Sequence, residues 1–390
     1  MHRLFRFLLV LILISPLAAN ANVHEEDTHN EDTHAMNADL SDEDVNKERN
    51  GEFVKHHTKD SHDFGLLVNE SENKHYGFPL PVILYDEGVH FFWSSEFDHG
   101  HAVVESNGMY YSLNTHDAKI YKTDEHGNIL TEEVVTKHTE NETAADGTTH
   151  EVITEEIAIV QLRPWDFSIT KNVFVTMMMC VLMFFLFKGI AKSYRTGLAP
   201  TGAAKFFEPI ILFIRDDIAR PNIGEKEHKR YMAYLLTVFF FIWFLNLAGM
   251  TPLGINVTGN LALTAGLALI TFFITTFTGN KNYWMHIFWM PGVPVPMKII
   301  LIPIELIGMV VKPFALMIRL YANMLAGHIV LGMLIVAVYT FSNVFAQGAF
   351  VGLTFFMNII ELLVAVLQAY IFTMLTALYF GSASAKAEHH

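Results

Sequence analysis

Cysteine is nearly absent from this sequence, and a nucleotide-binding motif is missing altogether. The chain of 390 residues has one cysteine, Cys180, so no disulfide within the chain can brace an exported part. Cys180 lies in an apolar run, and we interpret it as a small apolar filler. The phosphate-cradling pattern GxxxxGK[S/T] is absent, so the sequence does not predict a nucleotide-hydrolysing site of that kind.

Acidic residues are also scarce after residue 165. Only 9 of the 40 Asp and Glu residues lie in 166–390, together with 15 of the 26 Lys and Arg residues, whereas 22–165 holds 31 acids. The whole chain is 52% hydrophobic, with a mean hydropathy of +0.30 and 32 Phe. These values indicate an integral membrane protein whose two parts lie in different solvents.

The first 71 residues predict an export signal and a disordered segment. Residues 1–21 have a basic start, an apolar core and a small-residue site ending at Ala21, which is typical of a secretory signal peptide. Residues 22–71 are acidic and rich in His, with few large apolar side chains, so we expect disorder. The His spacing is irregular and no Cys joins it, which favours a solvated tail over a metal site.

Residues 72–164 predict a small extracytoplasmic β-rich domain. Short alternating runs are separated by the turn signals SNG, DEHGN and AADG. The runs are 101–105, 109–113, 119–122, 129–137 and 150–160.

Residues 165–384 predict an all-α polytopic membrane domain, followed by a polar tail, 385–390. About four membrane or interfacial helices are expected at 173–187, 205–220, 231–249 and 261–277. The 205–220 segment mixes charges with an apolar face, which suits an interfacial helix. Lys and Arg fall on one side each time, so by the positive-inside rule the C-terminus is cytoplasmic and the β-rich domain is outside.

Two further apolar runs, 299–341 and 344–380, are each too long for one perpendicular crossing, which takes about 20 residues. We therefore expect two long helices that are tilted, bent or partly horizontal. Polar residues interrupt both runs, although a charge at bilayer depth costs at least about 2.5 kcal/mol. In the first run these are Glu305, Lys312, Arg319, Asn323 and His328, and in the second Asn358, Glu361 and Gln368.

Helical geometry places these polar residues at different depths in the membrane and on different faces of their helices. At about 1.5 Å per residue, Glu305 lies roughly 21 Å to the cytoplasmic side of Arg319 and His328 roughly 13 Å to its outer side. Asn323 shares the Arg319 face, whereas His328 points away from it. Glu361 and Gln368 are seven residues apart and share one face of the second run. Gln368 can then approach Arg319, and Glu361 becomes a neighbour of His328.

A permanent cation between two aqueous inlets predicts a specific mechanism. Protons cannot pass Arg319, because a guanidinium neither accepts nor relays them at accessible pH. A mobile carboxylate on a partner could be deprotonated beside Arg319, protonated from the outer inlet and carried through lipid in its neutral form. Lys312 is interpreted as an interfacial anchor and Asn358 as a residue that holds helices together.

The motifs LAGMTPLG, RLYANMLAGH and ELLVAVLQAYIF carry a family resemblance. Residues 165–384 resemble subunit a of the F-type ATP synthase, the stator subunit that forms two half-channels against a rotating ring of c subunits. The resemblance implies that Arg319 faces the ring carboxylate, and that Asn323, Gln368, Glu361, His328 and the inner acid Glu305 form the proton path.

The resemblance also implies the setting. Partners would be the c ring, the peripheral-stalk b subunits, the soluble catalytic head and lipid, with no nucleic acid, no cofactor and no metal. The chain would be a non-catalytic subunit in the bacterial inner membrane.

The sequence departs from the family pattern in two places. Many bacterial members have Glu at the position of His328 and His at the position of Glu361, so the pair is exchanged here. The exported acidic extension is the second departure, and the resemblance does not explain it.

Two other classes of function fit the sequence less well. A secondary transporter would bind substrate at an ionised midplane cluster, but no internal repeat is present and the crossings are few. A metal exporter would need ligands within the membrane, where His328 stands alone among the His residues of the two long runs.

Overall fold

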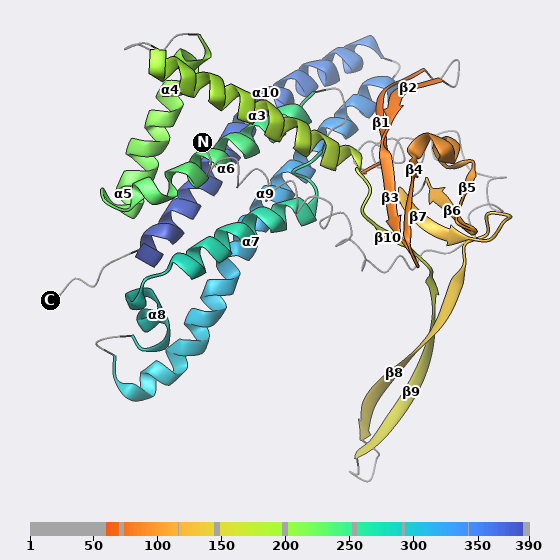
Figure 1. Cartoon of the computed structure of the whole chain (residues 1–390), viewed down its shortest axis with the longest axis horizontal. Helices are drawn as coiled ribbons and strands as arrows, with labels where there is room; N and C mark the ends of the chain where they lie inside the picture. Colours follow the sequence, from red (N-terminus) through yellow and green to blue (C-terminus); the bar gives the residue numbers. More distant parts are fainter. Residues whose placement is uncertain are drawn as a thin grey trace. The chain divides into compact units, whose positions relative to one another are not determined.

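The computed structural model describes residues 60–384 apart from 70–73, 116, 144–148, 197–201, 252–255, 291–292 and 342. The chain folds into two compact units, a β-rich unit, Ser61–Thr170, and a helical unit that continues from Lys171 (Figure 1). The expected signal peptide, most of the expected disordered segment and the polar tail lie outside the described residues. Each unit is described by itself.

The described part of the β-rich unit forms four antiparallel sheets. One three-stranded sheet has the order β10-β3-β4 and another the order β5-β6-β7, while β1 pairs with β2 and β8 with β9. The strands are β1 (Asp63–Asn69), β2 (Lys74–Pro79), β3 (Pro81–Tyr85), β4 (Val89–Trp93), β5 (Val103–Ser106), β6 (Met109–Asn114), β7 (Lys119–Thr123), β8 (Thr131–Thr143), β9 (Thr149–Gln161) and β10 (Trp165–Asp166).

The core of this unit lies between the two three-stranded sheets. Alternate residues of each strand point inward, so one sheet contributes Val82, Leu84 and Phe92, and the other contributes Tyr111 and Ile120. The short 3₁₀ helix η1 (Ser94–Gly100) packs beside them. The expected alternating runs are confirmed as β5 to β9. In β5 and β6, period-two alternation turns one face of the strand toward the core.

The β-rich unit extends beyond the bounds that the sequence predicted. It begins at Ser61 and ends at Thr170, not at 72 and 164. Strand β1, which falls in the segment expected to be disordered, pairs with β2 from Asp63 to Asn69. Backbone hydrogen bonds hold this hairpin, and backbone pairing leaves little mark on composition.

Within the described residues, the helical unit has five helices that are long and apolar enough to cross a membrane. These are α3 (Lys171–Thr196), α6 (His228–Gly249), α7 (Leu261–Thr278), α9 (Val295–Thr340) and α10 (Val344–Ser384), with the shorter α8 (Lys281–Phe288) between α7 and α9. The prediction of a mostly helical polytopic protein is confirmed, and the two long helices have 46 and 41 residues. Cys180 is buried in α3, as expected of an apolar filler.

Helix α6 lies at the centre of the helical unit. The Phe240 ring packs edge-on against Phe187 of α3 at 4.9 Å and against Phe207 at 5.6 Å, measured between ring centroids. On another side of α6, Tyr231 stacks on Phe380 of α10 at 4.4 Å. Aromatic contacts therefore join α6 to the helices around it.

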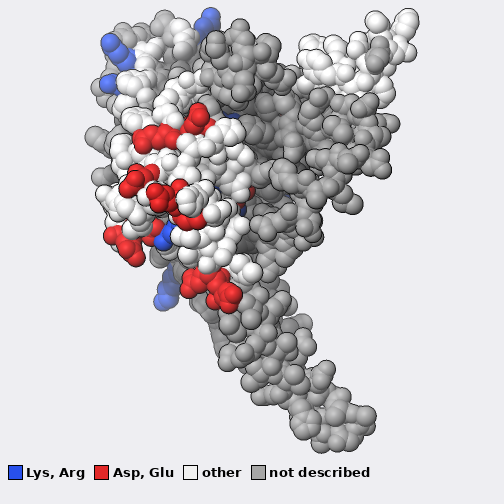
Figure 2. All heavy atoms as spheres, turned by 90° about the vertical axis from the view of Figure 1, so that its right-hand side faces the viewer, with Lys and Arg blue, Asp and Glu red and all other residues white. Residues whose placement is uncertain are grey.

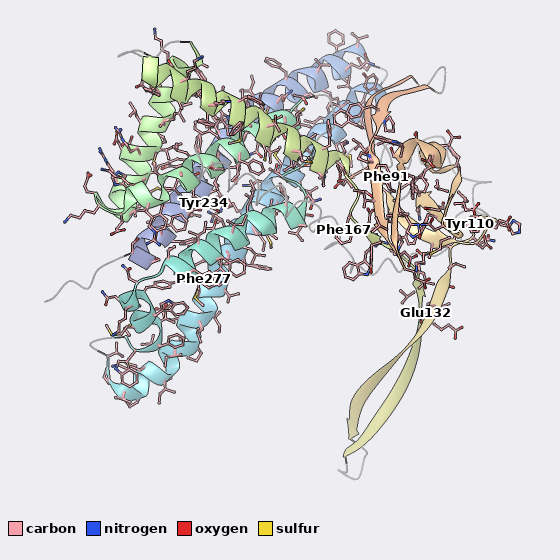
Figure 3. The ribbon with its side chains drawn as sticks, viewed as in Figure 1. Phe91, Tyr110, Glu132, Phe167, Tyr234 and Phe277 are labelled. Carbon is pink, nitrogen blue, oxygen red and sulfur yellow. The ribbon has the colours of Figure 1, made fainter. Side chains whose placement is uncertain are left out.

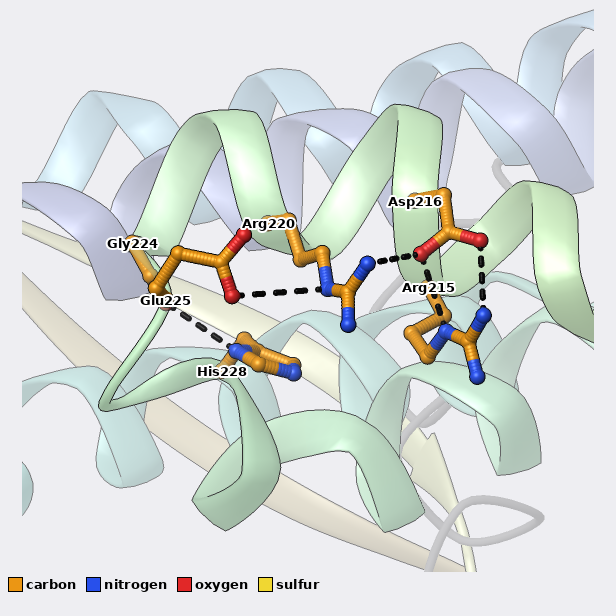
Figure 4. A network of polar contacts seen from close by, with 6 residues as sticks. All are labelled: Arg215, Asp216, Arg220, Gly224, Glu225 and His228. Atoms are coloured by element: carbon orange, nitrogen blue, oxygen red, sulfur yellow. Dashed lines mark hydrogen bonds and ion pairs between the residues drawn. The ribbon is translucent and has the colours of Figure 1, made fainter.

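The 205–220 segment is helical but not one regular helix. It runs through α4 (Ala203–Phe213), the π-helix η2 (Ile214–Ala219) and α5 (Arg220–Ile223). Its charges pair with each other: Arg215 donates to both carboxylate oxygens of Asp216 at 2.9 and 2.8 Å, and Arg220 donates to Asp216 at 2.7 Å (Figure 4). The hydrogen bond from Arg215 is the main reason that the pKa of Asp216 is lowered.

Candidate functional site

Helices α9 and α10 are antiparallel neighbours, and their register is set by two contacts. Near one end, the carboxylate of Glu361 lies against Gly327, and near the other, the ammonium of Lys312 lies 5.8 Å from the ring centroid of Tyr379. Both helices rise by about 1.5 Å per residue, so Gln368, seven residues after Glu361, is level with Leu320. Arg319 is next to this level.

Arg319 lies on the exposed side of α9. Its side chain is exposed, and no hydrogen bond or ion pair involves it within the described residues. Asn323, one turn later, is exposed on the same side, and the neighbouring exposed positions include the small residues Ala315, Ala322 and Ala326. Small residues let another helix approach closely, so a partner helix could reach the guanidinium here.

The opposite side of α9 faces the rest of the helical unit. The described residues buried on this helix are Lys298, Leu316, Leu320 and Met324. The last three follow a spacing of four residues, which keeps them on one face. Helix α9 is therefore packed on one side and open on the other, and Arg319 belongs to the open side.

Glu361 and Gln368 lie on the packed side of α10. Their residues are 7% and 5% exposed, and Ala365 between them is also buried. The seven-residue spacing keeps both on one face, as the sequence analysis expected. No hydrogen bond among the described residues joins Gln368 to Arg319.

We name three polar groups the Glu361 cluster: Glu361, His328 and Asn246. Glu361 contacts Gly327, which directly precedes His328. Both carboxylate oxygens of Glu361 and Nε2 of His328 are buried without a hydrogen-bond partner in the described part of the chain. Asn246 of α6 donates to the carbonyl of Ala365 at 3.3 Å, one turn from Glu361. The backbone of His328 is thus near Glu361, but no direct bond joins the two side chains.

A second set of polar residues, the Tyr379 cluster, lies toward the other end of α9. It lines a cavity of about 20 Å³, large enough for about one water molecule. The polar lining residues are Thr271, Thr275, Tyr283, Lys312, Tyr379 and Ser382. Pro313 also lines it and cannot donate to the carbonyl of Met309, so that carbonyl adds an acceptor.

Two charged residues of α9, Glu305 and Arg319, act on tyrosines of the Tyr379 cluster. Burial and then the negative charge of Glu305 raise the pKa of Tyr283, which connects the cluster to the acid. The positive charge of Arg319 acts on the Tyr379 hydroxyl. Polar side chains from α7, α8, α9 and α10 thus line a cavity that lies, along α9, between the levels of Glu305 and Arg319.

Several of these residues were missed by sequence reasoning. Lys312 was interpreted as an interfacial anchor, while Tyr379, Thr271 and Thr275 carried no signal in runs otherwise apolar. Asn246 was also missed, although a lone Asn inside an apolar helix could have been singled out. No group of three or more His, Cys, Asp or Glu that could hold a metal occurs among the described residues.

A family described as ATP synthase A chain matches residues 173–381, which include both clusters and Arg319. This match covers more than half of the chain. The chain belongs to the ATP synthase subunit a family. It is therefore a non-catalytic membrane subunit of that complex and assembles with other ATP synthase subunits.

Curated relatives agree with this assignment. The chain is 39% identical over 240 residues to ATP synthase subunit a 2 of Chlorobaculum tepidum, covering 59% of this chain and 67% of the relative. It is 41% identical over 231 residues to ATP synthase subunit a of Myxococcus xanthus, covering 58% and 76%. The corresponding protein of Chloroherpeton thalassium is 38% identical over 253 residues, covering 62% and 75%.

The β-rich unit matches a different family. Residues 53–146 match a family described as a domain of unknown function. The subunit a match begins at residue 173, after this unit ends.

Proposed function

We propose that the chain conducts protons through two offset half-channels against the rotating c ring of an F-type ATP synthase, with Arg319 as the barrier between them. The observation that carries this proposal is the exposed Arg319 on the open side of α9, with no ion pair among the described residues. An unpaired guanidinium in an apolar helix is costly, so a partner carboxylate is the expected source of compensation.

The open side of α9 suits such a partner. Exposed apolar residues beside Arg319, including Phe314 and Ile318, continue on α10 with Leu363 and Leu367. A ring helix could pack on this surface and bring its carboxylate to the guanidinium. The ring would pass from Arg319 into lipid only after the carboxylate is protonated, because a charged carboxylate is poorly solvated there.

The two clusters supply the inlets. The Glu361 cluster would be the outer one, where buried oxygens and a ring nitrogen without protein partners would hydrogen-bond to water. The Tyr379 cluster and Glu305 would form the inner one, which ends beside Arg319. Asn323, one turn from Arg319 on α9, and Gln368, close to the level of Arg319 on α10, would orient the partner carboxylate.

The remaining partners follow from the same proposal. The chain would be held by the peripheral-stalk b subunits and coupled through the ring to the soluble catalytic head. It would lie in the bacterial inner membrane, with the β-rich unit outside and the C-terminus in the cytoplasm.

The test is Arg319→Ala in membrane vesicles that carry the assembled enzyme. We expect ATP-driven proton pumping to be lost, while passive proton leak in vesicles stripped of the catalytic head is retained or raised. Tyr339→Ala, an exposed substitution near the far end of the same helix, is the control and should pump normally. Intact pumping in Arg319→Ala would show that Arg319 is a structural charge and would overturn the proposal.

A further inference from the structure

The outward face of the β10-β3-β4 sheet is aromatic and uncharged. Along β3 and β4, alternate residues point away from the core, and β10 extends the same face because Trp165 pairs with Tyr85. The exposed residues on this face are Tyr85, Val89, Phe91, Trp93, Trp165 and Phe167. Tyr85, Phe91 and Trp165 are 54%, 60% and 66% exposed, whereas a strand face turned to water normally carries polar residues.

The aromatic face lies on one side of the β-rich unit, and the opposite side carries charged residues. In Figure 3, Phe91 and Phe167 lie on one side of the β-rich unit and Tyr110 lies on the other. Tyr110 pairs with the exposed Glu105, so that side carries charge. Figure 2 shows acidic side chains spread over the face of the unit that it displays. The uncharged aromatic surface is therefore a local feature.

The chain tethers this face to the membrane boundary. Three residues separate Phe167 from Lys171, where α3 begins. Four fully extended residues span at most about 14 Å, so the Phe167 backbone cannot lie farther than that from the start of α3. The candidate span of 24 residues in α3 is about 36 Å long, slightly more than the roughly 30 Å hydrocarbon core, so Lys171 is at the boundary.

We propose that the aromatic face of this sheet lies on the outer leaflet of the bilayer and anchors the β-rich unit in the lipid headgroup region. Trp, Tyr and Phe suit this region, because their rings are apolar while Trp and Tyr keep a polar group for the wet side. The acidic segment 22–59 offers few large apolar side chains and would cover such a surface poorly. The covalent tether favours lipid as the occupant over a soluble partner.

The test uses the full chain reconstituted in vesicles of phosphatidylcholine and phosphatidylglycerol. Cys180→Ala gives a background without thiols, and Phe91→Cys then carries a spin label on the aromatic face. Glu105→Cys is the matched control, because it is an exposed strand position on the other side of the same unit. Collision rates of each label are measured with oxygen, which concentrates in lipid, and with a water-soluble nickel chelate.

At position 91 we expect oxygen collisions to exceed nickel collisions, and at position 105 the reverse. A label at Val89→Cys repeats the measurement in case the loss of the Phe91 ring disturbs the face. Equal, water-like profiles at 91 and 105 would overturn the proposal. Protection of position 91 from both reagents would also overturn it, because a protein surface would then cover the face.

Discussion

The carboxylate of Glu361 and the backbone of Gly327 are in direct contact across the interface of α9 and α10. A Cβ atom added at Gly327 would lie 2.9 Å from Oε1 of Glu361 and 3.3 Å from its Cδ. Glycine at this position gives the carboxylate the room to lie against α9, at the level of His328. Any larger side chain must displace it.

Gly327→Ala is therefore expected to shift the Glu361 carboxylate and leave the helices assembled, because the group that must give way is the end of a flexible side chain. We expect ATP synthesis driven by an imposed proton gradient to fall severalfold. Gly308→Ala is the control on the same helix, since a Cβ there meets nothing within 4 Å. Equal activity of the two variants would show that the position of this carboxylate does not matter.

Glu361 and His328 are predicted to act as a pair. Glu361→Gln and His328→Gln should each lower ATP-driven proton pumping strongly, because each removes one titratable group from the Glu361 cluster. The double exchange, His328→Glu with Glu361→His, keeps one acid and one imidazole and should recover part of the activity. The two single variants, His328→Glu and Glu361→His, are measured for comparison. If the double variant pumps no better than the less active of these two, the two residues do not act as a pair.

The Tyr379 cluster is predicted to admit water from the cytoplasmic side. Thr275 lines its cavity, and a thiol reacts with silver ions only where water reaches it. We expect Ag⁺ added on the cytoplasmic side to block proton flux in Thr275→Cys. The wild type is the control, because its single Cys180 is buried in α3 and should not respond. A Thr275→Cys enzyme as resistant as the wild type would exclude this route.

The His62–Asp166 pair is predicted to make the β-rich unit sensitive to acid. The ring of His62 lies 2.8 Å from Asp166. Burial alone would raise the pKa of Asp166, but the charge of His62 and hydrogen bonds from His62 and Ser168 outweigh it and hold the pKa below its usual value. The pair therefore stabilises the unit above the unfolded pKa of about 3.9, and the stabilisation is lost as pH falls through the lower folded value.

Asp166→Asn should weaken this part of the sheet at neutral pH by about 1 to 3 kcal/mol, the usual range for a charged hydrogen bond. Hydrogen exchange of the β3 and β10 amides in the full chain measures the loss, and the acid dependence should disappear with it. Glu132→Gln, at an exposed strand position, is the control. Unchanged exchange in Asp166→Asn at all pH values would contradict this role.

Much of the secondary structure could be predicted from local pattern. Period-two alternation predicted strands β5 to β9, and long apolar runs predicted α9 and α10 with their polar interruptions. Strand β1 was missed because backbone hydrogen bonds pair it with β2, and backbone pairing leaves little mark on composition. Helix periodicity also predicted that Glu361 and Gln368 share a face, and both are buried on it.

Features that are formed by more than one helix could not be predicted from local pattern. The Tyr379 cluster takes one or two polar residues from each of four helices, and each residue is unremarkable in its own run. The open side of α9 also depends on which of its faces α7, α8 and α10 cover. Periodicity alone predicts which residues share a face but does not say whether that face meets protein.

Hydropathy, period and rise per residue are local properties, and so the membrane class, the elements and the order of charged groups along α9 can be read from the chain alone. The contact of Glu361 with Gly327, the open position of Arg319 and the aromatic sheet face four residues before α3 became visible only in the folded molecule. These features depend on which surfaces are buried together, and that choice is made by packing between segments distant in the chain.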